Sequence, residues 1–296
     1  MINFNSNLDF EYGVPSYLDD NIRRIIAHNP SHFTLHGTGT YIIGKDNVAV
    51  IDPGPDDDQH IDNLLKSLEG EKISHIFITH THKDHSPAAK KLHDITGAPT
   101  YGFGKHPRVS SKSIIAVEEG ADYDFIPIIN INDNEVYEGT NWKIRAIHTP
   151  GHTSNHVCYE LLEKNILFSG DHLMAWSTTV ISPPDGNMSQ YLKSLYKLLD
   201  LPIKKCWPTH GPCIDNVRTF IESTISHRNF REKQILESLK FKKNIFEIVK
   251  DLYKEKDPIL YPAASLSVMA HIIHLIEKGK VYTNSDVSLN SKFYLT

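Results

Sequence analysis

The sequence contains little cysteine and no pattern typical of disulfides. Its three cysteines, Cys158, Cys206 and Cys213, are widely spaced in a chain of 296 residues and form no C-x-x-C pair. Disulfide-rich secreted domains carry a dense and usually even set of cysteines. The odd, sparse set therefore predicts reduced thiols, and we expect Cys158, which lies in a strand-like run, to be a small core residue.

The sequence also lacks the segments that direct proteins to membranes. Its first 15 residues, MINFNSNLDFEYGVP, contain no basic cluster followed by an apolar stretch, so they do not resemble a secretory signal. We find no apolar run that approaches the length of a membrane span. These absences predict a cytoplasmic protein without a membrane partner.

No strong excess of one charge marks the chain. It has 31 Lys and Arg and 36 Asp and Glu, a net charge of −5. From residue 227 onward, 12 basic residues stand against 8 acidic ones. This small surplus weakly favours an acidic partner for the C-terminal part, but it is small for a phosphate-binding surface. A solvated helical surface with spare lysines is the better explanation.

Histidine, by contrast, is abundant and clustered. Residues 78–89, ITHTHKDHSPAA, contain an H-x-H-x-D-H pattern made by His80, His82, Asp84 and His85. The preceding run HIFIT predicts a strand, and Ser86 and Pro87 predict the N-cap and first turn of a helix that ends near Gly97. A polar loop between a strand and a helix is a frequent place for a catalytic site.

Further histidines and aspartates follow later strand-like runs, beside Gly, Pro or Thr. They are His148, His152 and His156 in IHTPGHTSNH, Asp171 and His172 in LFSGDH, and His210 in WPTHGP. Singly, each is more often a hydrogen-bonded structural residue than a metal ligand. Together with the first cluster, they predict a metal site built from several strand ends.

The order of apolar runs indicates two parts of the chain. Strands and helices alternate to about residue 215, which indicates a layered α/β domain. Beyond it, helical patterns cover 217–239, 243–255 and 264–278, and KVYT at 280–283 reads as a short strand. We therefore expect a catalytic domain over residues 1–215 and a winged-helix-like domain over 216–296.

The motifs H-x-H-x-D-H, T-P-G-H-T, S-G-D and P-T-H-G, in this order, resemble the metallo-β-lactamase superfamily of hydrolases. Asp52-Pro53-Gly54 is similar to the early D-x-G turn of that family, and the resemblance covers residues 35 to about 213. It implies a four-layer αββα sandwich with a dinuclear metal site at one edge of the two sheets. It also implies hydrolysis by a metal-bridging hydroxide without a serine or cysteine nucleophile.

The resemblance implies a role for each matching residue. His80, His82 and His152 would hold the first metal, Asp84, His85 and His210 the second, and Asp171 would bridge the two. Asp52 would orient a ligand from behind. Zn²⁺ suits this set best, with two ions per chain, although Mn²⁺ or Fe would accept the same ligands. Besides Asp84, the expected catalytic residues are His156 and His172, the candidates for the general acid.

The segments GDHLMAWSTTVISPPDGNMSQYLKSL and HRNFREKQIL narrow the resemblance to the beta-lactamase-like protein two subgroup. Members of this subgroup carry a C-terminal winged helix, and one is a single-strand-preferring endoribonuclease. This favours a hydrolase of single-stranded RNA or of a small ester, lactone or thioester. Ser177, Thr178 and Thr179 would then offer hydroxyls to a phosphate.

The alternative is a nucleic-acid-binding winged-helix module whose metal domain is structural or vestigial. The complete ligand set argues against a vestigial domain. The winged helix would otherwise wall the active-site cleft, with Tyr261 and Pro262 in that wall, or mediate a homodimer.

Overall fold

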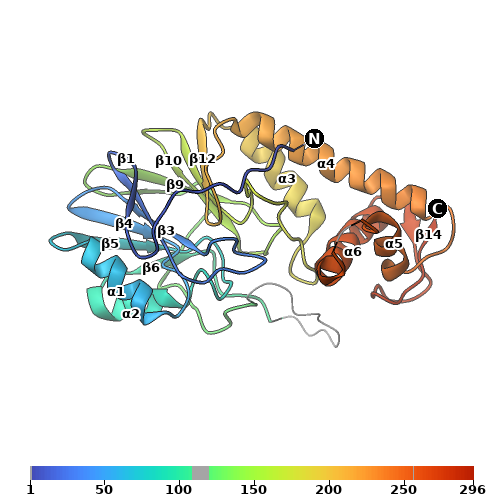
Figure 1. Cartoon of the computed structure of the whole chain (residues 1–296), viewed down its shortest axis with the longest axis horizontal. Helices are drawn as coiled ribbons and strands as arrows, with labels where there is room; N and C mark the ends of the chain where they lie inside the picture. The colour runs from blue at the N-terminus through green and yellow to red at the C-terminus, as the bar shows by residue number, and fades with distance from the viewer. Residues whose placement is uncertain (1, 109–119, 256) are drawn as a thin grey trace.

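Two packed β-sheets form the centre of the structure, a computed structural model that describes residues 2–108, 120–255 and 257–296 (Figure 1). The first sheet has seven strands in sequence order: β1 (Ser16–Asp19), β2 (Ile22–Ile26), β3 (Gly39–Ile43), β4 (Asn47–Ile51), β5 (Lys72–Phe77), β6 (Thr100–Gly102) and β7 (Ile129–Asn130). The strands are antiparallel as far as β4, and β4 to β7 are parallel neighbours. β3 and β4 form an antiparallel hairpin that leads to Asp52.

The second sheet has five strands in the order β12-β11-β10-β9-β8. They are β8 (Val136–Glu138), β9 (Lys143–His148), β10 (Val157–Leu161), β11 (Ile166–Gly170) and β12 (Lys205–Pro208). β11 and β12 run parallel, and the other neighbours are antiparallel. β9, β11 and β12 are the strand-like runs that were expected to precede His148, Asp171 and His210.

Helices cover the outer face of each sheet and complete four layers. Helices α1 (Asp58–Ser67) and α2 (Ala88–Thr96) pack on the first sheet, and α3 (Met188–Leu199) and α4 (Val217–Ser238) pack on the second. Side chains that alternate along β3 contact two different layers. Tyr41 and Ile43 face the other sheet, and Ile42 faces the helical layer. The predicted αββα sandwich is confirmed, and so is Cys158 as a buried core residue.

Helix α2 begins differently from the prediction. Pro87 occupies the N-cap position and no side chain caps this helix. Ser86 instead donates its hydroxyl hydrogen to Asp122 Oδ2 at 2.6 Å, which ties the loop after β5 to a distant segment. At the other end, Gly97 has φ of 73° and terminates the helix as predicted, because glycine adopts this left-handed conformation without strain.

The C-terminal part has its own core. It contains the end of α4, α5 (Ile245–Leu252), the short 3₁₀ helix η1 (Pro258–Leu260), α6 (Tyr261–Glu277), β13 (Val281–Tyr282) and β14 (Tyr294–Leu295). The three helices and the short strand β13 were predicted, and β14 was not. Helix α4 contributes Val217 to the core of the sandwich and Ile235 to the C-terminal core. Because one helix serves both cores, the domain boundary at residue 215 stays a prediction.

One expectation about hydrophobic runs needs correction. Residues Pro258–Glu277 form a helical segment of 20 residues with mean hydropathy 1.7, which is long and apolar enough to cross a membrane by these criteria. Half of the segment is buried inside the fold, and its fully buried His271 faces Glu232 of α4. These contacts describe the central helix of the C-terminal core.

Candidate metal centre

Five loops meet at one edge of the two sheets and bring the predicted ligands together. They follow β4, β5, β9, β11 and β12, and they carry Asp52, the His80–His85 cluster, His152, Asp171 and His210. All seven predicted metal ligands belong to groups of side chains whose donor atoms lie within 4.8 Å of one another. The strand ends thus place on one site residues that are up to 130 positions apart in sequence.

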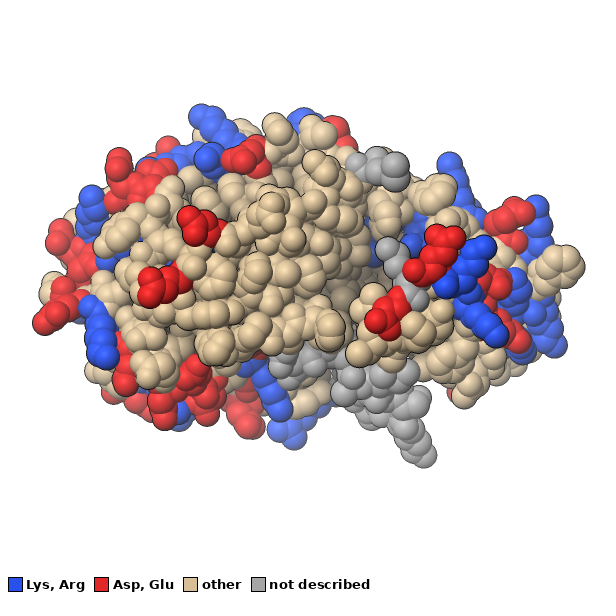
Figure 2. Space-filling model, in the orientation of Figure 1, with Lys and Arg blue, Asp and Glu red and all other residues tan. Residues whose placement is uncertain are grey.

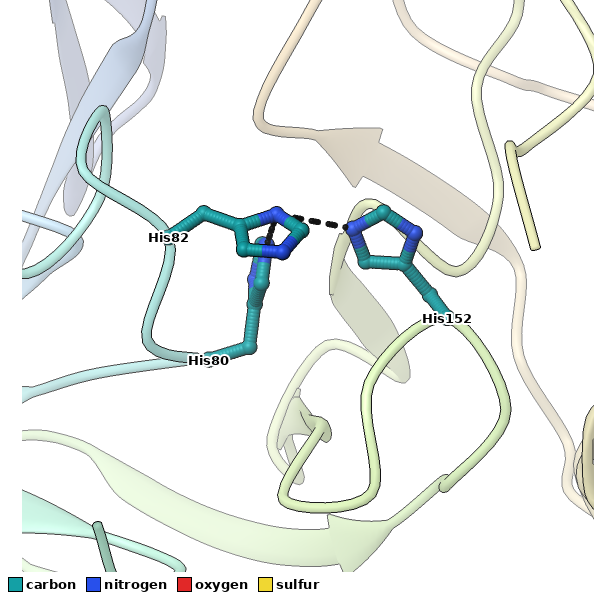
Figure 3. A group of neighbouring side chains, drawn as sticks. All are labelled: His80, His82 and His152. Atoms are coloured by element: carbon teal, nitrogen blue, oxygen red, sulfur yellow. Dashed lines mark hydrogen bonds between the residues drawn. The ribbon is translucent and has the colours of Figure 1, made fainter. Parts of the chain in front are cut away.

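The first group consists of three histidines whose ring nitrogens point toward one another (Figure 3). Nδ1 of His82 lies 3.1 Å from Nε2 of His80 and 3.2 Å from Nε2 of His152. Burial, together with the neighbouring histidines, holds the pKa of His80 and of His82 well below the ordinary value. The rings are therefore neutral near pH 7 and carry lone pairs for a metal ion.

The second group pairs two histidines with carboxylates. Oδ2 of Asp84 lies 3.2 Å from Nε2 of His85 and 3.1 Å from Nε2 of His210. Asp171 faces both groups, because its Oδ1 lies 3.6 Å from His85 Nε2 and 3.5 Å from His210 Nε2, while its Oδ2 lies 3.8 Å from His152 Nε2. This position between the groups is the one that the resemblance implies for a bridging ligand.

Protonation in the second group is set by its carboxylates. Burial lowers the pKa of His85, but the negative charges of Asp84, Asp171 and Asp52 outweigh burial and raise the pKa well above its ordinary value. Burial raises the pKa of Asp171, but His210, His85 and His152 outweigh it and lower the pKa. Without a cation, protons on the histidines balance these carboxylates, and a divalent cation would replace those protons.

The outward nitrogens of four candidate ligands each have a partner in the chain. The pairs are His80 Nδ1 with Thr79 Oγ1 (3.1 Å), His85 Nδ1 with Asp52 Oδ2 (2.8 Å), His152 Nδ1 with Val180 O (2.7 Å) and His210 Nδ1 with Gly37 O (3.1 Å). When the outer N–H of a histidine ring donates to such an oxygen, the other ring nitrogen directs its lone pair toward the site. Metal-binding histidines are held in this way.

Asp52 connects three of the loops from behind the site. It is fully buried, and its Oδ1 accepts a hydrogen bond from the backbone N–H of Thr79 at 2.8 Å. Its Oδ2 accepts hydrogen bonds from the hydroxyls of Thr79 and Thr209, at 2.7 and 3.0 Å, besides contacting His85. The two threonines were not predicted, because a lone hydroxyl beside a ligand has no distinctive spacing in sequence.

The residues fit two divalent cations. Among the described residues, His85 Nε2 and Asp171 Oδ1 are buried atoms that make no hydrogen bond, and their ion-pair contacts are 3.2 to 3.6 Å long. Such an atom costs about 1–3 kcal/mol when it stays unsatisfied, and a cation between the groups would satisfy both. Imidazole nitrogens and carboxylate oxygens are also the ligands that zinc and related metals accept.

The two general-acid candidates lie deeper than the ligands. His156 is fully buried, with Nδ1 2.9 Å from Thr149 Oγ1 and Nε2 accepting the backbone N–H of Asp171 at 3.2 Å. His172 is also fully buried and packs against the ring of Tyr191. Their role as general acids stays a prediction, and the contacts of His156 position the Asp171 turn.

A cleft of about 230 Å³ opens over the metal-binding groups. His82, Asp84, Asp171 and His210 line its base, and its remaining lining residues are His32, Phe33, Met174, Trp176, Ser177, Val180, Leu260 and Ala263. The described lining is mostly apolar and includes no lysine or arginine. Apart from Ser177, these wall residues were not predicted from sequence, since single apolar residues in loops carry no pattern.

Two of the three hydroxyl residues expected beside the site, Ser177 and Thr179, differ in their contacts. Ser177 lines the cleft, as the phosphate hypothesis requires. Thr179 is buried and donates its hydroxyl hydrogen to the carbonyl oxygens of Asp171 and His172, at 2.7 and 3.0 Å. Thr179 therefore stabilises the loop after β11 and offers nothing to a substrate.

Sequence comparisons agree with this geometry. The Metallo-beta-lactamase superfamily matches residues 34–210, and the Beta-lactamase associated winged helix domain matches residues 245–288. A beta-lactamase-like protein 2 homolog from Drosophila melanogaster is 34% identical over 290 residues, 94% of each chain. An atrochrysone carboxyl ACP thioesterase from Aspergillus fumigatus is 27% identical over 229 residues, 75% of this chain and 66% of its own.

Solved structures show the same fold over nearly the whole chain. A metallo-beta-lactamase family protein from Thermus thermophilus matches 94% of this chain and 100% of its own, with a TM-score of 0.76 and 19% identity. A beta-lactamase domain protein from Burkholderia ambifaria matches 96% and 94%, with a TM-score of 0.80 and 17% identity. This chain therefore belongs to the metallo-beta-lactamase superfamily, as a hydrolase with a beta-lactamase-associated winged-helix domain.

Proposed function

We propose that this protein is a dinuclear zinc hydrolase that cleaves a small ester, lactone or thioester next to an apolar acyl group. The observation that carries the proposal is the continuity between the two metal-binding groups and an apolar cleft. His82, Asp84, Asp171 and His210 belong to both. A group held in the cleft therefore lies beside the atoms that would hold the cations.

The chain's own residues supply positioning and charge. His80, His82 and His152 would hold one cation, and Asp84, His85 and His210 the other, with Asp171 facing both. Two bound cations would lower the pKa of water and stabilise the negative charge that develops on the substrate oxygen. The buried base of the site limits access of bulk water, and this strengthens those interactions.

The lining of the cleft favours a neutral substrate over RNA. Proteins that bind single strands combine a basic groove along the phosphates with aromatic stacking. The cleft offers Phe33 and Trp176 for stacking, but its described lining has no lysine or arginine. On the face shown in Figure 2, basic residues of the C-terminal part are interspersed with acidic ones. A relative named as an ACP thioesterase also supports thioester chemistry.

A substrate panel on zinc-loaded protein tests the proposal. The panel contains acyl thioesters, aryl esters and lactones, together with a fluorescent single-stranded RNA, and His82→Ala serves as the inactive variant. We expect the protein to hydrolyse at least one carbonyl substrate and not to cleave the RNA. The hydrolytic activity should be lost in His82→Ala. Cleavage of RNA alone, lost in the same variant, would instead establish an endoribonuclease. RNA binding without any turnover would support a nucleic-acid-binding module.

A further inference from the structure

We infer that Leu260, from the C-terminal part of the chain, sets the size of the acyl group that the cleft accepts. The inference rests on the proposed function and adds a specificity residue outside the sandwich. Leu260 is the last residue of η1, and it lines the cleft together with Ala263 of α6. The cleft is therefore completed by an element that contains no metal ligand.

The local backbone fixes the direction of Leu260. The side chain of Asp257 accepts the backbone N–H of Ile259 at 3.0 Å, and its carbonyl oxygen accepts the N–H of Leu260 at 3.0 Å. Leu260 is 40% exposed and lines the cleft, whereas its neighbour Ile259 is 62% exposed and does not belong to the lining. Two adjacent apolar side chains on one turn thus differ in whether they face the site.

Contacts between helices hold this turn against the sandwich. Ala270 of α6 packs in the apolar cluster that joins the second sheet to α3. Nδ1 of His274 on α6 lies 2.5 Å from Oγ of Ser189, near the start of α3. Because α6 is anchored in this way, Leu260 forms a fixed part of the wall.

The occupant that suits this wall is a short apolar acyl group. Phe33, Met174, Trp176 and Val180 supply apolar lining from the sandwich, and Leu260 supplies it from the C-terminal part. The Trp176 ring also packs on the backbone after His210, since a Cβ at Gly211 would lie 2.8 Å from its Cδ1. At about 230 Å³, the cleft is smaller than the roughly 300–1,000 Å³ of sites for drug-sized ligands. A long acyl chain would contact Leu260.

The test is an acyl-chain series measured on Leu260 variants. Thioesters from acetyl to octanoyl are assayed with wild-type protein, Leu260→Ala, Leu260→Trp and the matched control Ile259→Ala. A buried methylene is worth about fourfold in kcat/KM, so kcat/KM should rise with chain length until the chain meets Leu260. Leu260→Ala should move this maximum to longer chains. Leu260→Trp should lower the octanoyl-to-acetyl ratio by about tenfold or more.

The controls distinguish a failure of the inference about Leu260 from a failure of the proposed function. Bound zinc should stay within about twofold of wild type in every variant, and Ile259→Ala should keep both the wild-type acetyl turnover and the wild-type chain-length profile. An unchanged chain-length profile in both Leu260 variants overturns the inference alone. Wild-type protein that binds zinc but hydrolyses no member of the series and no other ester overturns the proposed function, and the inference with it.

Discussion

At the scale of single residues, the site depends on how buried polar groups share protons. The three histidines of the first group lie among neutral rings, whereas the histidines of the second group lie among carboxylates. One site therefore contains a neutral half and a charge-paired half. Cations would bind the first half through the ring nitrogens of neutral histidines and the second half by displacing protons.

Asp52 supports the second half from behind, through its contact with His85 Nδ1. Replacing it in Asp52→Asn keeps the size of the side chain and removes the charge next to His85. We expect the affinity for the second zinc ion to fall about 10–100-fold, the usual cost of losing a partner behind a ligand. Competition with a fluorescent zinc chelator measures this affinity. Asp56→Asn, on the exposed surface, is the matched control and should bind zinc like wild type.

His82 is the shared neighbour in the first half. His82→Ala removes the nitrogen that faces both His80 and His152, so we expect loss of one of two zinc ions and a drop in kcat/KM of at least about a thousandfold. Elemental analysis and the ester assay measure the two effects. The exposed His28→Ala variant should change neither, and retention of two zinc ions in His82→Ala would refute the assignment.

The positions of the candidate ligands could be predicted from sequence and the walls of the cleft could not. The candidates lie in loops that follow apolar runs, as His152 between β9 and β10 shows, and the family motifs separate them from His148, His156 and His172 in similar places. That they hold metal stays a prediction. Phe33, Trp176 and Leu260 meet only because distant segments pack together. Expectations based on a single local signal were the ones that failed, as with Ser86, whose hydroxyl contacts Asp122 instead of the helix.

At the scale of elements, α4 joins the C-terminal part to the metal centre. Arg228 is almost completely buried and donates to the carbonyl oxygen of Thr179 at 2.5 Å. The next residue, Val180, holds Nδ1 of His152 through its own carbonyl oxygen. A helix outside the ligand loops thus supports the orientation of one ligand.

We therefore expect Arg228→Met to lower the affinity for the first zinc ion by about tenfold while the fold is retained. Methionine replaces the apolar stem of the arginine but not its hydrogen-bond donor. Zinc competition titration and circular dichroism measure the two properties. Arg231→Met is the matched control, since Arg231 lies on the same helix over the ring of Tyr253, at 4.4 Å. Equal zinc affinities in the two variants would contradict this role for α4.

At the scale of the whole molecule, buried histidines make stability depend on pH. Burial lowers the pKa of His271 to about 4 and that of His60 to about 4, against 6.5 in an unfolded chain. Between pH 6.5 and 4 the unfolded chain binds these protons and the folded protein does not. The free energy of unfolding should therefore fall as the pH drops through this window. Each of the two histidines contributes up to about 1.4 kcal/mol per pH unit.

Urea unfolding of zinc-free protein at pH 7, 6 and 5 measures this effect. His271→Leu removes one of the titrating groups, so its loss of stability on acidification should be smaller than that of wild type. The exposed His28→Leu variant should follow wild type. Equal pH dependence in wild type and His271→Leu would show that His271 does not carry the effect.

The two parts of the chain form one functional unit in this account. The sandwich provides the ligands, and the C-terminal part provides Leu260 to the cleft and Arg228 to the loop behind His152. The C-terminal part thus resembles the predicted wall of the cleft more than a separate nucleic-acid-binding module. The residues that line the cleft are Leu260 and Ala263, whereas Tyr261 and Pro262 were expected. The cytoplasmic location and the homodimer stay predictions.

The most direct test of the central claim is a zinc titration of metal-free protein that records bound zinc and ester hydrolysis together. We expect about two zinc ions to bind per chain and hydrolysis to reach its plateau when both sites are filled. Full hydrolytic activity in metal-free protein, or a plateau reached with no zinc bound at the His80, His82 and His152 group, would contradict it.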